Sequence, residues 1–96
     1  MNRNEQVAIE ILNAIDRARA GNATLDDLER SIWRLLEQAD SDFPRVLAGR
    51  VEGLVDEVRR IQRENQAYAA GNDVDENRGA DVAFNEITGA LGRFLD

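Results

Sequence analysis

The stretch that decides the fold is residues 24–39, which read TLDDLERSIWRLLEQA. Its apolar side chains recur at steps of three and four residues, the spacing of one face of an α-helix. This apolar stripe consists of Leu25, Leu28, Ile32, Leu35, Leu36 and Ala39. Thr24 precedes the stripe and Asp27 follows three residues later, as in a capping box. The stretch therefore predicts an amphipathic helix capped by Thr24.

Three further helices are predicted on either side of this one. The first ends at Gly21-Asn22, the third spans roughly residues 43–69 with Pro44 in its first turn, and the fourth follows a break at residues 71–79. Their apolar stripes, in chain order, are Val7, Ile11, Ala14, Ile15 and Ala18; Leu47, Val51, Leu54, Val58 and Ile61; and Phe84, Ile87, Leu91, Phe94 and Leu95. Short connections place successive helices antiparallel. The expected fold is all-α, an antiparallel up-down four-helix bundle formed by one domain of residues 1–96.

Gly49 and Gly53 lie inside the third predicted helix. Glycine in a helix interior costs up to about 1 kcal/mol relative to alanine. The expected compensation is the close packing of a neighbouring helix. In a chain with a small core, the same pair also favours self-association.

The charge of the chain indicates what kind of partner it would bind. The 96 residues carry a net charge of −7 at pH 7, and every basic residue is an arginine. Such a chain is repelled by nucleic acids and by anionic membranes, so a charged partner is expected to be basic. The absence of cysteine fits a reducing cytoplasm. The sequence has no apolar run that would predict a secretory signal or a membrane span.

The residue inventory argues against an enzyme. Histidine and cysteine are both absent, which removes the commonest general base, nucleophile and metal ligands. No glycine-rich phosphate-binding loop occurs. We therefore expect no catalytic residues, no cofactor and no metal.

Residues 71–81, GNDVDENRGAD, come close to a calcium-binding loop. Counted from Asp73, the position that needs glycine is Arg78 and the position that needs a bidentate glutamate is Phe84. Both departures exclude an EF-hand site. The carboxylates are expected instead to cap the fourth helix, from Asp73, Asp75 or Asp81.

Three arginines of the third helix, at positions 59, 60 and 63, are interspersed with acids. Asp56 and Arg60 stand in the favourable order for an i,i+4 ion pair. This pattern indicates a solvated surface with salt bridges, and no nucleic-acid site.

The second helix carries the candidate partner-binding residues. At 100° per residue, Trp33 falls at the margin of the apolar face, beside a strip of carboxylates. The candidate set is Asp26, Glu29, Trp33, Glu37, Asp40 and Asp42, together with Asp73, Asp75 and Glu76 in the later break. Two interpretations are open: Trp33 packs against a neighbouring helix, or it anchors a partner that the acids attract.

Residues 24–58, TLDDLERSIWRLLEQADSDFPRVLAGRVEGLVDEV, resemble small acidic helical immunity proteins of bacterial polymorphic and contact-dependent toxin systems. The resemblance implies an antitoxin that binds a cognate toxin domain, often a cationic nuclease, in the cytoplasm of the producing cell. It assigns no residue by motif. Two alternatives are a structural or adaptor protein that forms a homodimer, and a phage-type inhibitor that imitates nucleic acid.

Overall fold

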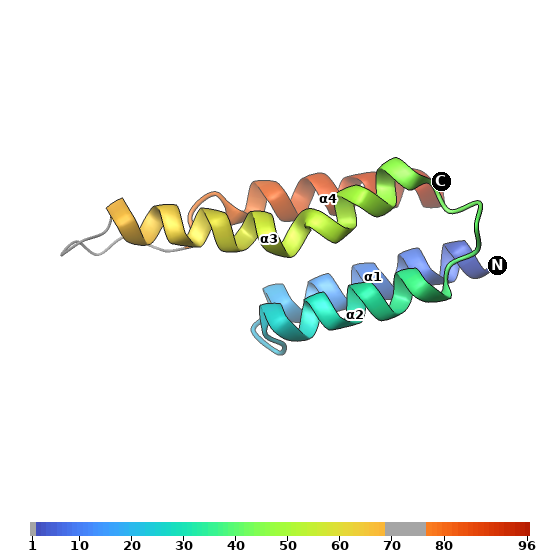
Figure 1. Cartoon of the computed structure of the whole chain (residues 1–96), viewed down its shortest axis with the longest axis horizontal. Coiled ribbons are helices and arrows are strands. Elements are labelled where there is room, and N and C mark those ends of the chain that lie inside the picture. Colours follow the sequence, from blue (N-terminus) through green and yellow to red (C-terminus); the bar gives the residue numbers. More distant parts are fainter. Residues whose placement is uncertain (1, 69–76) are drawn as a thin grey trace.

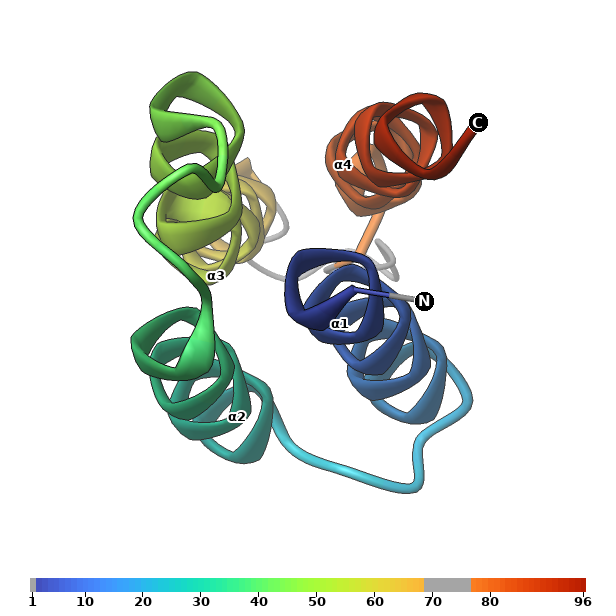
Figure 2. The same cartoon turned by 90° about the vertical axis from the view of Figure 1, so that its right-hand side faces the viewer.

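The computed structural model describes residues 2–68 and 77–96, which form four α-helices and contain no strand. The helices are α1 (Arg3–Arg19), α2 (Leu25–Gln38), α3 (Arg45–Tyr68) and α4 (Ala80–Leu95). Each helix packs against the next in the sequence, and α1 also packs against α4 (Figures 1 and 2). The fold is therefore the predicted antiparallel up-down four-helix bundle.

The core is built mainly from the predicted apolar stripes, with Val55 of α3 as a buried residue that no predicted stripe included. The largest fully buried side chains come from all four helices: Ile11, Ile15, Leu28, Ile32, Leu54, Leu91, Val51, Val55 and Val58. Burying one side chain of this size contributes roughly 1.5–3 kcal/mol relative to leaving it exposed. The packing of these stripes holds α2 against α1 on one side and α3 on the other.

The two ends of the α1–α2 connection follow the expected local chemistry. Gly21 adopts a φ of 82°, and the backbone N–H of Asn22 donates to the carbonyl of Arg17 at 2.9 Å. Such a left-handed residue ends a helix at low cost when it is glycine. The capping box of Thr24 and Asp27 is present, with both hydrogen bonds at 3.1 Å. The predicted start of α2 is thus confirmed.

The boundaries of α3 and α4 differ from the prediction. Helix α3 begins at Arg45, and Phe43 lies before it, buried and with its ring centroid 5.4 Å from that of Phe94. Helix α4 begins after Gly79, at a φ of 90°, without a side-chain cap. Of the three carboxylates expected to cap α4, Asp81 does not, because it lies within the first turn and its carboxylate faces Arg19 at 3.4 Å. Asp73 and Asp75 lie outside the described residues.

Gly49 and Gly53 do not mark a close helix contact. A Cβ atom added to either glycine would meet nothing within 4 Å. The expected packing of a neighbouring helix on them is therefore wrong. Both glycines instead line an open groove between α3 and α4.

Asn4 is the one buried polar residue among the described positions. Its Nδ2 donates to Oδ1 of Asp42 at 2.8 Å, and its Oδ1 accepts from the backbone N–H of Asp40 at 2.8 Å. Figure 1 shows the start of α1 and the α2–α3 connection at the same end of the bundle. Asn4 therefore ties the first turn of α1 to that connection.

Candidate protein-binding site

The predicted residues of α2 and the following connection lie at the surface. Asp26, Trp33, Glu37, Asp40 and Asp42 are exposed. Glu29 is partly buried. These six differ, however, in whether their side chains are already bound within the fold.

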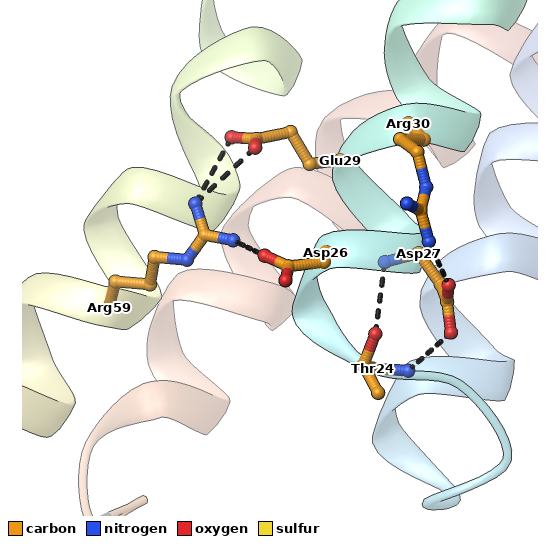
Figure 3. A network of polar contacts seen from close by, with 6 residues as sticks. All are labelled: Thr24, Asp26, Asp27, Glu29, Arg30 and Arg59. Atoms are coloured by element: carbon orange, nitrogen blue, oxygen red, sulfur yellow. Dashed lines mark hydrogen bonds and ion pairs between the residues drawn. The ribbon is translucent and has the colours of Figure 1, made fainter.

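Asp26 and Glu29 face an arginine of the next helix. Nη1 of Arg59 lies 3.3 Å from both carboxylate oxygens of Glu29, and Nη2 is paired with Asp26 (Figure 3). The Arg59 side chain is 30% exposed and that of Glu29 is 34% exposed. One cation thus partly neutralises two of the predicted acids and joins α2 to α3.

Asp27 and Arg30 also belong to α2, and their side chains lie on the side of that helix away from Arg59 (Figure 3). The Asp27 carboxylate accepts the backbone N–H of Thr24 and is paired with Arg30. The Thr24 hydrogen bond, followed by the Arg30 contact, lowers the pKa of Asp27 below its ordinary value of 3.8. Its carboxylate is therefore part of the helix cap and not of a free acidic strip.

Among the carboxylates at the end of α2 and just after it, one is bound within the fold and two are not. Asp42 accepts the side-chain hydrogen bond of Asn4. The carboxylates of Glu37 and Asp40 have no hydrogen bond or ion pair within residues 2–68 and 77–96. These two acids can meet a partner without first breaking a contact in the fold.

Trp33 is 49% exposed, so its indole is neither a core side chain nor fully solvated. It lies one helical turn after Glu29, on the same side of α2. The rings of tryptophan bury a large apolar area when a partner covers them. This half-exposed indole is the feature of the described surface best suited to anchor another protein.

The structure adds two acids that the sequence did not assign to the site. Because α2 and α3 are antiparallel and Glu29 faces Arg59, Trp33 is level with residues one turn before Arg59 on α3. Asp56 and Glu52 stand three and seven residues before Arg59, spacings that place them on the Arg59 side of α3. In the described part of the chain neither carboxylate has a bonding partner. Their spacing along α3 was readable in the sequence, but the facing of Arg59 and Glu29 across the two helices was not.

The expected Asp56–Arg60 pair is not formed. Arg60 is paired with Glu57 and with Glu64, the latter at 2.7 Å. The Arg60 hydrogen bond lowers the pKa of Glu57. Since these two glutamates occupy the guanidinium, the exposed Asp56 carboxylate has no partner in the described part of the chain.

We call Trp33, Glu37, Asp40, Glu52 and Asp56 the Trp33 surface. It combines an apolar ring with four carboxylates that have no described partner. Carboxylates attract a cationic partner over distances of about a Debye length, and an indole face binds an arginine or lysine side chain. The arrangement is suited to protein binding.

Asp73, Asp75 and Glu76, the remaining predicted site residues, lie outside the described residues, as does most of the 71–81 stretch. Within the described ranges, no group of three or more acidic side chains is placed to hold a metal ion. None of the helices there combines the length and the apolar character needed to cross a bilayer.

The chain was compared with known proteins at the level of families, sequences and structures. No protein-family model matches it. No curated protein and no solved structure matches it either. The candidate site accordingly stands on its own geometry.

Proposed function

We propose that this chain is a stoichiometric inhibitor that binds a basic protein through the Trp33 surface, as expected of an immunity protein that neutralises a cationic nuclease toxin. The observation that carries the proposal is the half-exposed Trp33, together with four carboxylates of α2, the α2–α3 connection and α3 that have no partner in the described fold. At protein interfaces, a buried aromatic side chain surrounded by charged residues often supplies much of the binding energy.

The net charge of −7 supports the choice of a basic partner. A nuclease attracts phosphates with a basic cleft, and carboxylates presented at that cleft occupy the places of phosphates. Opposite charges also raise the association rate. Fast association is useful to an inhibitor that must reach an active toxin before it turns over substrate.

The unpaired acids are the better candidates for contact. Glu37, Asp40, Glu52 and Asp56 meet a partner's arginines and lysines without losing an existing bond. Asp26 and Glu29 must first release Arg59, or share it. We therefore assign these two a supporting role in the placement of α2.

Co-expression with the product of the adjacent upstream gene tests the proposal. The expected result is a one-to-one complex that copurifies and restores growth to cells expressing that toxin. The site is tested by reversing Glu37 and Asp40 to arginine. The matched control reverses Glu10 and Asp16 to arginine, because both are exposed on α1 and the net charge changes by the same amount.

The expected difference is a slower association for the Glu37→Arg/Asp40→Arg variant than for the Glu10→Arg/Asp16→Arg variant. Equal affinities for the two variants would exclude the Trp33 surface as the contact. Absence of any complex with a basic toxin domain would exclude the inhibitor function.

A further inference from the structure

A second surface of α3 has features that the Trp33 surface does not explain. It is a groove between α3 and α4 with a volume of about 590 Å³. Its floor is small or apolar: Gly49, Gly53, Leu54, Ala83 and Ile87. The two glycines leave open space where side chains would otherwise stand. Another helix can therefore approach the backbone of α3 closely at this point.

The groove continues into a second hollow of about 360 Å³ between the start of α3 and the end of α4. Val46 lines this hollow and is 74% exposed, the largest exposure of any large hydrophobic side chain among the described residues. An apolar side chain beside an open apolar groove adds to the area that a partner can bury.

The charges along the groove are separated by sign. Arg50 and Arg93 line both hollows and form a basic end. Glu57 and Glu86 line the main groove farther from Val46 and form an acidic end. Arg50, Arg93 and Glu86 have no ion pair within the described residues, whereas Glu57 is paired with Arg60. The groove therefore carries one basic and one acidic end over an apolar floor.

We infer that this groove is a face on which a second copy of the chain docks by two-fold symmetry. A two-fold axis that lies in the contact plane, perpendicular to the helices, makes the helices of the second copy antiparallel to those of the first. The basic end of each groove then faces the acidic end of the other, so both contacts are favourable. An axis parallel to the helices instead places like charges together, which selects the first arrangement.

In the selected arrangement α3 lies antiparallel against α3 of the second copy. Gly49 and Gly53 are near the middle of the groove, where the two helices come closest. The contacting part of each copy covers about 18 Å of two helices, or roughly 400 Å². The two copies together bury roughly 800 Å², which is below the standard size of specific interfaces, and the net charges of the two copies repel. The dimer is therefore weak and reversible.

Sedimentation equilibrium on the full chain tests the inference, from about 10 µM to 1 mM at 0.15 M salt. The expected result is a monomer–dimer equilibrium. Gly53→Leu fills the groove and is expected to abolish the dimer while circular dichroism shows an unchanged helix content. A wild-type chain that stays monomeric throughout this range would overturn the inference.

Charge reversal supplies the sharper test. Arg50→Glu/Arg93→Glu makes both ends acidic, and Glu57→Arg/Glu86→Arg makes both ends basic. Each variant alone is expected to lose the dimer, and an equimolar mixture is expected to regain it as a heterodimer. Glu86→Arg alone keeps the Glu57–Arg60 pair and should weaken the dimer by about tenfold or more. Dimerisation of each double variant at wild-type strength, or no recovery in the mixture, would refute the docking mode.

The groove and the Trp33 surface share no residue. The dimer inference does not depend on the proposed inhibitor function. Each can therefore fail without the other.

Discussion

Arg59 of α3 directs Nη1 to both carboxylate oxygens of Glu29 on α2, each at 3.3 Å. The same guanidinium is paired with Asp26 through Nη2. This contact adds to the burial of Leu28, Ile32 and Leu35 in favouring one rotation of α2 relative to α3. That rotation in turn sets the side of α2 on which Trp33 is exposed.

Replacing Arg59 with alanine is expected to lower the free energy of unfolding by about 0.5–1.5 kcal/mol. The value is modest because exposed ion pairs contribute little, and the two side chains facing each other here are about one-third exposed. Urea denaturation measures the change. Arg63→Ala is the control, since Arg63 is exposed on the same helix and has no described ion pair. Equal losses for the two variants would show that the pairing with α2 adds no stability.

Trp33→Ala should separate binding from stability. Because the side chain is already 49% exposed, its removal should lower the free energy of unfolding by less than about 2 kcal/mol. Loss of an interface anchor should cost 2 kcal/mol or more of partner affinity. Calorimetry on the complex and urea denaturation of the free protein give the two values. A large loss of stability with little loss of affinity would assign Trp33 to the packing of α2.

The single tryptophan also makes partner binding visible by fluorescence. An indole that passes from partly solvated to buried shifts its emission to shorter wavelength, so the partner should produce a blue shift. A complex formed with no change in the emission spectrum would place the contact elsewhere.

Gly49→Ala and Gly53→Ala are each expected to raise the free energy of unfolding of the monomer by about 0.5–1 kcal/mol. Alanine is the better helix former, and a Cβ atom at either position meets nothing within 4 Å. Thermal or urea denaturation at a concentration below the dimer range measures the gain. Gly79→Ala is the contrasting variant and should destabilise, because Gly79 has a φ of 90°. Destabilisation by both helical substitutions would mean that the groove is filled in solution.

Acid should weaken the fold partly through Asp27. Its pKa is lowered in the folded protein, first by the backbone hydrogen bond from Thr24 and then by Arg30. The unfolded chain therefore takes up a proton at a higher pH, near 3.8, than the folded chain does. The stabilisation that Asp27 provides is complete above pH 3.8, and it is lost as the pH falls through the lowered pKa of Asp27 in the folded protein.

Asp27→Asn should accordingly flatten the dependence of unfolding free energy on pH below about 5. Asp16→Asn is the control, because Asp16 is exposed on α1 and has no described partner. An unchanged pH dependence in Asp27→Asn would show that the Asp27 carboxylate has the same pKa in the folded and the unfolded protein.

Local features of the fold were predictable from the sequence, and contacts between helices were not. The stripe of α2 and the Thr24 capping box depend on spacing within one helix, so both were predicted correctly. The edge position of Trp33 followed from the same spacing. The pairing of Asp26 and Glu29 with Arg59 depends on how α2 and α3 are placed, which periodicity along one helix does not contain.

Two other differences have the same origin. Phe43 precedes a proline and carries no helical pattern, yet the end of α4 provides Phe94 as a contact. The absence of a neighbour over Gly49 and Gly53 is likewise a property of the assembled bundle. For the candidate site, the sequence identified the side of α2. The structure separated the acids that are bound within the fold from those without a partner in residues 2–68 and 77–96.

The hydrogen bonds of Asn4 bear on which alignment of the helices is selected. Apolar stripes that repeat every seven residues can slide past one another by a heptad, about 10 Å, and still bury their side chains. A slipped α1 would leave the amide of Asn4 in an apolar contact without Asp42 and the Asp40 backbone to satisfy it. The two hydrogen bonds of this buried amide thus favour the observed register over the shifted ones.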